Sequence, residues 1–165
     1  MINDILKLIF ITLLPFLELR ASIPAGIIGG NISFFGISIS ILRMPWLTVF
    51  IVCVITNIIL GIIIYFMLDK FINFFLRFKI IEIPYKKIVL RTQRKIHPYV
   101  EKYGEIGVAL FIGVPLPGSG VYTGALGAYV LGLKFKKFIV ANIIGVLIAG
   151  IIVTIISTGV LQLTT

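Results

Sequence analysis

Two long apolar runs without a charged residue restrict the fold more than any other feature of the chain. They are Trp46–Leu68, with 23 residues, and Phe138–Leu163, with 26 residues. At about 1.5 Å per residue each forms a helix of at least about 34 Å, which exceeds a hydrocarbon core of about 30 Å. Charged residues make up only 13% of the chain, against about 25% in soluble domains, which excludes an ordinary soluble fold. We expect one all-α integral membrane domain over residues 1–165.

Two further apolar regions, Ile5–Leu42 and Ile106–Leu133, are each interrupted near the middle by proline and glycine. The interruptions are Glu18–Gly26 in the first region and Pro115–Gly120 in the second. The helical pieces beside them, including an expected helix over Ala25–Gly36, are too short to cross a bilayer. We therefore predict two re-entrant helical hairpins. Their tips should meet inside the protein, because irregular backbone at membrane depth is tolerated only there or along a watery cavity.

The two halves of the chain share one layout, a hairpin followed by a full span. A hairpin adds no membrane crossing and a span adds one, so the halves have opposite orientations, which predicts an inverted repeat. Repeat 1 covers residues 1–68, a linker covers 69–103 and repeat 2 covers 104–165. Of the 15 basic residues, 12 lie in the linker or in the loop at 134–137. Basic loops stay cytoplasmic, so we expect a multi-pass protein of the cell membrane with both termini outside.

The linker contains a basic amphipathic stretch after Pro84. We expect it to form a helix in the headgroup layer that contacts anionic lipid. The basic residues on its charged face are Lys87, Arg91, Arg94 and Lys95. The alternative is a solvated linker without a specific partner. We expect no nucleic-acid partner, because the topology accounts for the basic residues and no binding motif accompanies them.

Glu18 is the only acidic residue inside the apolar regions away from their ends. A charge at that depth costs at least about 2.5–3.5 kcal/mol unless protonation or pairing neutralises it. Glu18 is therefore a candidate proton carrier or cation ligand. The alternative is a structural pair with Arg20, which needs a broken backbone because residues two apart do not face each other on a helix. Pro24 favours such a break, and Arg20 is also a candidate ligand for a phosphate or carboxylate group.

The second interruption has no charge. A half-helix that begins near Ser119 would point N–H groups and a positive dipole end into the cavity, which suits an anion or the Glu18 carboxylate. The alternative is that the polar residues of this tip only satisfy the broken backbone. The candidate residues of this tip are Pro117, Gly118, Ser119, Tyr122 and Thr123. Asn57 and Asn142 occupy matching positions in the two spans, and we expect them to tie the hairpin tips by interhelical hydrogen bonds.

No arrangement of an enzyme active site is present in the sequence. The single histidine, His97, lies in the basic linker, and no metal-ligand cluster, nucleophile elbow or phosphate loop is found. We therefore expect no enzyme activity, no metal and no cofactor.

The segments Pro15–Pro24 (PFLELRASIP) and Phe111–Gly120 (FIGVPLPGSG) resemble the small multidrug export protein family, a relative of the DedA (VTT-domain) superfamily. The resemblance implies facing re-entrant hairpins. From the superfamily it implies proton-linked scrambling or flipping of phospholipids or polyprenyl-phosphate carriers, and the family name implies drug export. Glu18 matches the acidic residue of the superfamily's first hairpin. The superfamily's two arginines around the second proline correspond to Val114 and Gly120 here, which counts against phosphate capture at this tip.

We expect a membrane transporter that moves a lipid-like or amphipathic substrate through a cavity between the tips. Proton coupling through Glu18 is part of this hypothesis. Two alternatives stay open, an ion-independent lipid scramblase and a non-transport membrane scaffold that acts through the basic linker. The expected partners are membrane lipids, the amphipathic or lipid substrate and protons, and four short elements per chain are compatible with a homodimer.

Overall fold

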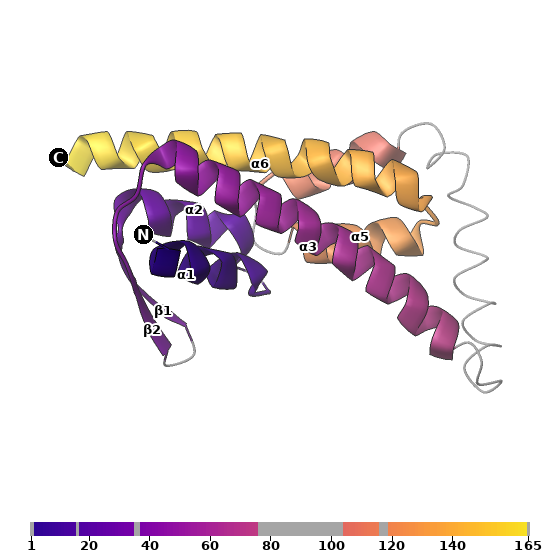
Figure 1. Ribbon diagram of the computed structural model, residues 1–165. Coiled ribbons are helices and arrows are strands. Elements are labelled where there is room, and N and C mark those ends of the chain that lie inside the picture. The colour runs from indigo at the N-terminus through magenta and orange to yellow at the C-terminus, as the bar shows by residue number, and fades with distance from the viewer. Residues whose placement is uncertain (1, 16, 35–36, 76–103, 116–118, 165) are drawn as a thin grey trace.

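The computed structural model describes residues 2–15, 17–34, 37–75, 104–115 and 119–164. Two long helices, α3 (Trp46–Phe75) and α6 (Phe135–Thr164), run in opposite directions along the molecule (Figure 1). By length and apolar composition they are able to cross a membrane, over Trp46–Leu68 in α3 and Phe135–Leu163 in α6. The two continuous helices predicted from the uncharged runs are therefore confirmed.

Each interrupted region forms two short helices with non-helical residues between them. In the first region these are α1 (Ile2–Leu13) and α2 (Glu18–Ile28). In the second they are the helical segment Gly104–Gly113 and α5 (Val121–Val130). The longest has 12 residues, which corresponds to about 18 Å, so none of them crosses a bilayer by itself.

The first break begins earlier than predicted, directly after Leu13 rather than at Glu18. Proline disfavours the helical conformation in the residue before it and lacks an N–H, so α1 ends at Leu13. Glu18 is the first residue of α2, and its φ of 44° is a left-handed value that is uncommon outside glycine. Pro24 lies inside α2 without ending it. The prediction that residues 18–26 form the break is wrong, because neighbouring helices packed around α2 support a proline in its interior.

A β-hairpin follows α2, which corrects both the all-α prediction and the expected helix over Ala25–Gly36. Strand β1 (Gly30–Phe34) pairs antiparallel with β2 (Ile37–Ile41). Isoleucine and serine alternate along β2 with a period of two, which favours a strand over a helix. Gly29 ends α2 with a φ of 77°, a conformation that glycine adopts readily. The hairpin lies at the end of the molecule that holds both chain ends (Figure 1).

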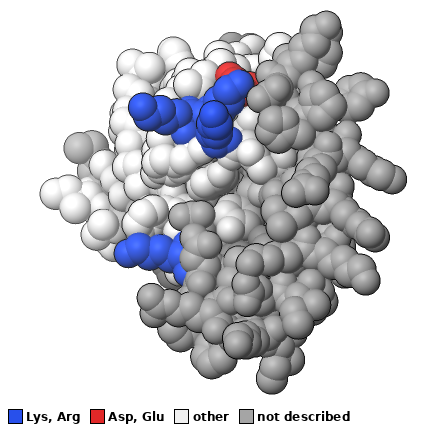
Figure 2. All heavy atoms as spheres, turned by 90° about the vertical axis from the view of Figure 1, so that its right-hand side faces the viewer, with Lys and Arg blue, Asp and Glu red and all other residues white. Residues whose placement is uncertain are grey.

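The opposite end of the molecule is basic. Figure 2 shows Lys and Arg side chains gathered on this face, where α3 ends and α6 begins. Lys137 forms an ion pair with Glu105 at 2.8 Å, and Lys134 and Lys136 precede Lys137 in the chain. The predicted lipid-binding residues of the linker lie outside the described residues. They are Lys87, Arg91, Arg94 and Lys95.

The core forms where the short helices pack against the long ones. α2, from the first half of the chain, packs against α6 as well as α3, and α5, from the second half, packs mainly against α3. Gly145 permits one close approach, because a Cβ there would lie 2.6 Å from the carbonyl oxygen of Ala109. Near the basic end, Tyr65 stacks on Phe138 with ring centroids 4.6 Å apart and donates a hydrogen bond to the Leu133 carbonyl.

Candidate functional site where the two chain breaks meet

The two chain breaks lie against each other midway along the long helices, although they are far apart in the sequence. In Figure 1, α2 and α5 lie nearly end to end, and the first turn of each helix faces the other. The N-terminus of a helix carries a partial positive charge and N–H groups without intrahelical acceptors. The meeting point of α2 and α5 is therefore suited to an anionic group.

The Glu18 carboxylate occupies this meeting point and is only 4% exposed. Its Oε2 accepts a hydrogen bond from the backbone N–H of Val121 at 3.2 Å, and its Oε1 accepts one from Tyr122 at 3.4 Å. Val121 and Tyr122 are the first two residues of α5, so Glu18 caps that helix from the other half of the chain. The structure thus brings Glu18 to the first turn of α5.

Gly120 permits the close approach of this carboxylate. An added Cβ at Gly120 would lie 2.4 Å from Oε2 and 2.7 Å from Oε1 of Glu18. Gly120 also has a backbone φ of 151°, a value that residues with a side chain rarely adopt. Both its lack of a side chain and its backbone freedom are needed at this position.

Arg20 binds the second break directly. Its Nη2 donates hydrogen bonds to Ser119 Oγ at 2.8 Å and to the Val114 carbonyl at 3.3 Å. The Ser119 hydroxyl donates to the same carbonyl at 2.7 Å. Val114 directly follows the helical segment Gly104–Gly113, so these two side chains satisfy a backbone acceptor that the break leaves exposed.

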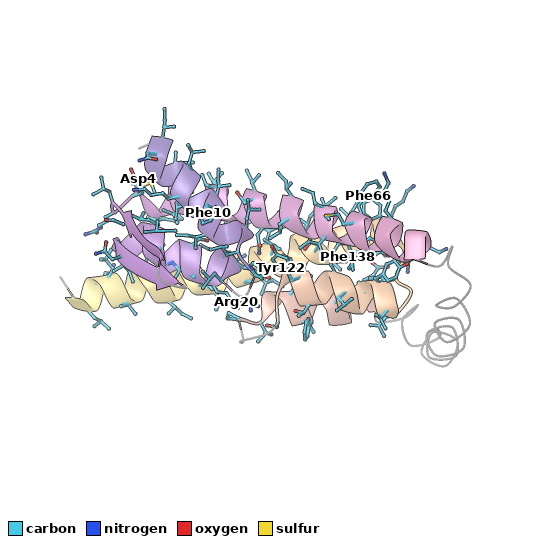
Figure 3. The ribbon with its side chains drawn as sticks, turned by 90° about the horizontal axis from the view of Figure 1, so that it is seen from below. Asp4, Phe10, Arg20, Phe66, Tyr122 and Phe138 are labelled. Atoms are coloured by element: carbon cyan, nitrogen blue, oxygen red, sulfur yellow. The ribbon has the colours of Figure 1, made fainter. Side chains whose placement is uncertain are left out.

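Tyr122 makes the reciprocal contact with the first break. Its hydroxyl donates a hydrogen bond of 2.6 Å to the carbonyl of Leu13, the last residue of α1. Figure 3 shows Arg20 and Tyr122 near each other between the two halves of the molecule. Thr123, by contrast, makes a local contact, from its Oγ1 to the Gly120 carbonyl at 3.4 Å. Each break is therefore contacted by a side chain of the helix that follows the other break.

The two span asparagines have different roles. The side chain of Asn57, only 1% exposed, lies beside the Glu18 carboxylate. Asn142 instead donates from Nδ2 to the Ile58 carbonyl at 3.0 Å and packs against Gly61. Asn142 therefore ties α6 to α3, and the prediction that it ties a hairpin tip is wrong. The Asn142 side chain packs against α3 because Gly61, which has no side chain, leaves room for it there.

Sequence reasoning missed a buried hydroxyl chain behind Glu18. Ser22 Oγ donates to the Glu18 carbonyl at 3.1 Å, and Thr12 Oγ1 lies 2.7 Å from Ser22 Oγ. Both side chains are fully buried. The signal in the sequence that could have revealed this chain is the presence of two hydroxyl side chains within otherwise apolar helices. These contacts support the left-handed backbone at Glu18.

The remaining predicted site residues are less informative. Pro24 is half-buried in α2, whereas Pro117 and Gly118 lie outside the described residues. Within the described part of the chain, no three His, Cys, Asp or Glu side chains come together as a metal site.

Comparison with known proteins gives one match. The family described as "Putative small multi-drug export protein" matches residues 18–152. This segment begins at Glu18, directly after the first break, and contains the second break, Arg20 and Tyr122. No curated protein and no solved structure matches the chain.

Proposed function

We propose that this chain, which belongs to the small multi-drug export protein family, moves an amphipathic or lipid-like substrate across the membrane and uses Glu18 as its proton-binding group. The family and the two apolar helices fit a membrane transporter. The observation that carries the finer proposal is the Glu18 carboxylate, which is buried where two chain breaks meet. An ionisable residue inside a membrane domain is a functional candidate because burying it is costly.

In this proposal the paired short helices are two re-entrant hairpins that insert from opposite sides of the membrane. Their lengths support this, since a helix of 10–12 residues reaches at most about 18 Å. The packing of α2 on α6 and of α5 on α3 supports an inverted repeat, because each short helix contacts the long helix of the other half. The basic end of the molecule faces the cytoplasm, by the positive-inside rule, and both termini face outside.

The contacts of Glu18 also define how protons act on the site. When ionised, the carboxylate holds the first two N–H groups of α5. Protonation removes its charge and weakens those charge-assisted hydrogen bonds. The N–H groups of Val121 and Tyr122 then become available to a polar group of the substrate. Glu18 and the substrate thus compete for one helix terminus, which links proton binding to substrate binding.

The test is translocation by the purified protein in liposomes, with a fluorescent phospholipid analogue and an anionic amphipathic dye as separate substrates. Each is measured with and without an imposed proton gradient. We compare the wild type with Glu18→Gln and with the matched control Glu105→Gln, which removes an acidic side chain at the basic end. The wild type and Glu105→Gln should respond to the gradient, whereas Glu18→Gln should not.

Three results would contradict parts of the proposal. Gradient-dependent transport by Glu18→Gln at the wild-type rate would show that Glu18 is not the proton-binding group. Wild-type lipid translocation that ignores the gradient would favour an ion-independent scramblase. Absence of translocation of both substrates would end the lipid and amphipathic-dye proposal.

A further inference from the structure

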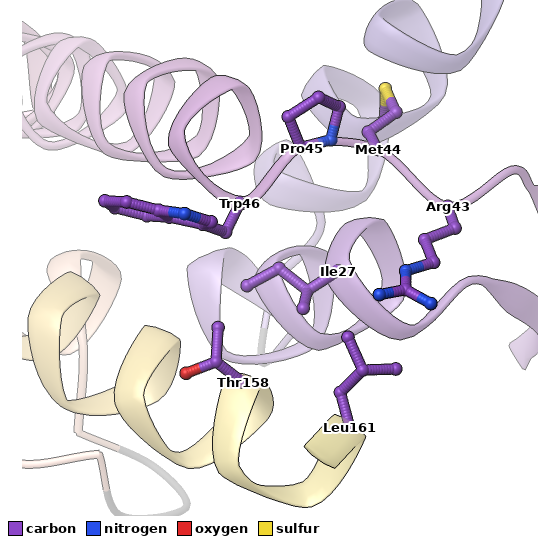
Figure 4. A pocket seen from close by; sticks show the side chains of 7 residues that line it. All are labelled: Ile27, Arg43, Met44, Pro45, Trp46, Thr158 and Leu161. Carbon is purple, nitrogen blue, oxygen red and sulfur yellow. The ribbon is translucent and has the colours of Figure 1, made fainter. Parts of the chain in front are cut away.

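A pocket of about 360 Å³ lies at the end of the molecule that holds both chain ends. It is lined by residues from the turn before α3, from α2 and from the last turns of α6 (Figure 4). Trp46 is the first residue of the apolar span of α3, and Leu161 lies two residues before the end of the apolar span of α6. The pocket therefore lies where both long helices reach a membrane–water boundary, the depth at which tryptophan is enriched.

Arg43 is the charged residue of this pocket. In Figure 4 its guanidinium extends over the pocket toward Ile27 and Leu161. Among the residues that the structure describes, the guanidinium has no hydrogen bond or ion pair. The described acidic side chains are engaged elsewhere, since Asp4 pairs with Lys7, Glu105 with Lys137 and Glu18 with the N-terminus of α5. The positive charge of Arg43 is thus without a counter-charge in this part of the protein.

The other lining residues are mainly apolar. Ile27, Met44, Pro45 and Leu161 form apolar walls, and Trp46 adds an indole ring that is about half exposed. Thr158 contributes a hydroxyl that already donates to the Thr154 carbonyl at 2.9 Å, so its oxygen remains an acceptor. A pocket in the range of about 300–1,000 Å³ accommodates a small molecule or the polar part of a larger one. The Arg43 guanidinium suits a phosphate group, and the apolar lining suits the glycerol and the first carbons of an acyl chain that are joined to it.

We propose that this pocket binds the headgroup of an anionic phospholipid, with its phosphate on Arg43 and its glycerol against the apolar walls. Arginine presents a planar fork of donors that matches phosphate. The ligand comes from the leaflet on the side of the chain termini, opposite the basic end. This site is separate from the meeting point of the chain breaks, and lipid binding here does not require that the protein transports the lipid.

The single tryptophan of the chain, Trp46, allows a direct measurement. The full chain is reconstituted in phosphatidylcholine vesicles that contain phosphatidylglycerol, and one of the two lipids carries bromine on its acyl chains to quench Trp46 fluorescence. In the wild type we expect phosphatidylglycerol to be enriched at Trp46 by roughly fivefold over phosphatidylcholine, from the attraction of one basic residue for anionic lipid. In Arg43→Gln the ratio of the two lipids at Trp46 should fall to about one, because the substitution removes the positive charge that attracts the anionic lipid. Arg43→Lys should retain most of the enrichment.

The control variant is Lys7→Gln, which removes a basic residue near the β-hairpin, outside this pocket. It should retain the enrichment. An equal loss in Lys7→Gln and Arg43→Gln would show a general surface attraction and overturn the proposal. So would a wild type without lipid preference, or an equal loss in Arg43→Gln and Arg43→Lys, which would point to a disturbed turn. In a further arm, excess inorganic phosphate at matched ionic strength should leave the quenching unchanged. Displacement by free phosphate would assign the site to a soluble ligand instead.

Discussion

Gly120→Ala is the substitution that tests the meeting of the two chain breaks most directly. The new Cβ would lie 2.4 Å from Oε2 of Glu18, against an ordinary contact of 3.4 Å or more. To restore that contact, the carboxylate has to move by about 1 Å from its position. This displacement would lengthen the hydrogen bonds of 3.2 Å and 3.4 Å that hold Glu18 to the first turn of α5.

The expected cost has two parts. Each hydrogen bond to a charged group contributes about 1.5–3 kcal/mol, and a side chain forced into a sparsely populated backbone region costs about 1–3 kcal/mol. Loss of one bond together with the backbone strain lowers the free energy of unfolding by roughly 3–5 kcal/mol. For a chain of this length, a loss of about 3 kcal/mol corresponds to a fall in Tm of roughly 6–12 °C.

Cys53 provides the assay, because it is the single cysteine of the chain and is fully buried. A thiol-reactive fluorogenic dye in detergent solution labels Cys53 only when the protein opens, so the labelling temperature reports Tm. Gly127→Ala is the matched control within α5, since a Cβ there meets nothing within 4 Å. Alanine is the better helix former by about 0.8–1 kcal/mol, so this control should leave Tm unchanged or raise it.

A double-substitution cycle separates the two parts of the cost. Glu18→Ala removes the group that the new Cβ would strike, so Gly120→Ala should cost less in that background than in the wild type. Because the two residues are in contact, we expect a coupling of roughly 1–3 kcal/mol. If Gly120→Ala has the same Tm as Gly127→Ala, or if the two costs at Glu18 and Gly120 are additive, the inferred contact is wrong.

Three further substitutions test the remaining contacts by the same Tm measurement. Tyr122→Phe removes the hydrogen bond to the Leu13 carbonyl and should lower stability by about 1 kcal/mol, whereas an unchanged Tm would show that the bond does not form. Arg20→Lys keeps the charge but loses the arginine fork, and we expect a loss of about 1–2 kcal/mol, which wild-type stability would contradict. Asn142→Ala removes the stabilising hydrogen bond to the Ile58 carbonyl, but it also removes a buried amide oxygen without a described partner. Because the second change offsets part of the first, stability should fall by no more than about 1 kcal/mol. A much larger loss would show that this oxygen has a partner.

The elements that were predictable from the sequence are those set by local composition. The uncharged runs became α3 and α6, and the proline- and glycine-rich segment before Val121 ended one helix and allowed another to begin. The position of the first break was not predictable from composition, because Pro15 and Pro24 are both prolines in apolar surroundings, yet the helix ends before Pro15 and continues through Pro24. Tertiary packing decides which of two such prolines ends a helix. The β-hairpin was missed although the alternation along Ile37–Ile41 has the period of a strand.

The contacts between the breaks were harder to predict because they depend on placement rather than composition. The pairing of Tyr122 with Leu13 joins residues 109 positions apart and exists only because α2 and α5 lie end to end. The different partners of Asn57 and Asn142 show the same limit. Their matching sequence positions led to one expected role, but Gly61 opens space for Asn142 on α3.

The arrangement of α2 and α5 gives Glu18 a structural role as well as the proposed functional one. Two helix N-termini that face each other bring together two regions of partial positive charge, and Arg20 adds a full positive charge beside them. The ionised Glu18 carboxylate offsets these charges and thereby holds the halves of the chain together. Loss of its charge then has two linked effects: it weakens the contact between the halves, and it leaves an electropositive site for an anionic group. In the proposed proton-coupled transport, both effects would come from this one side chain.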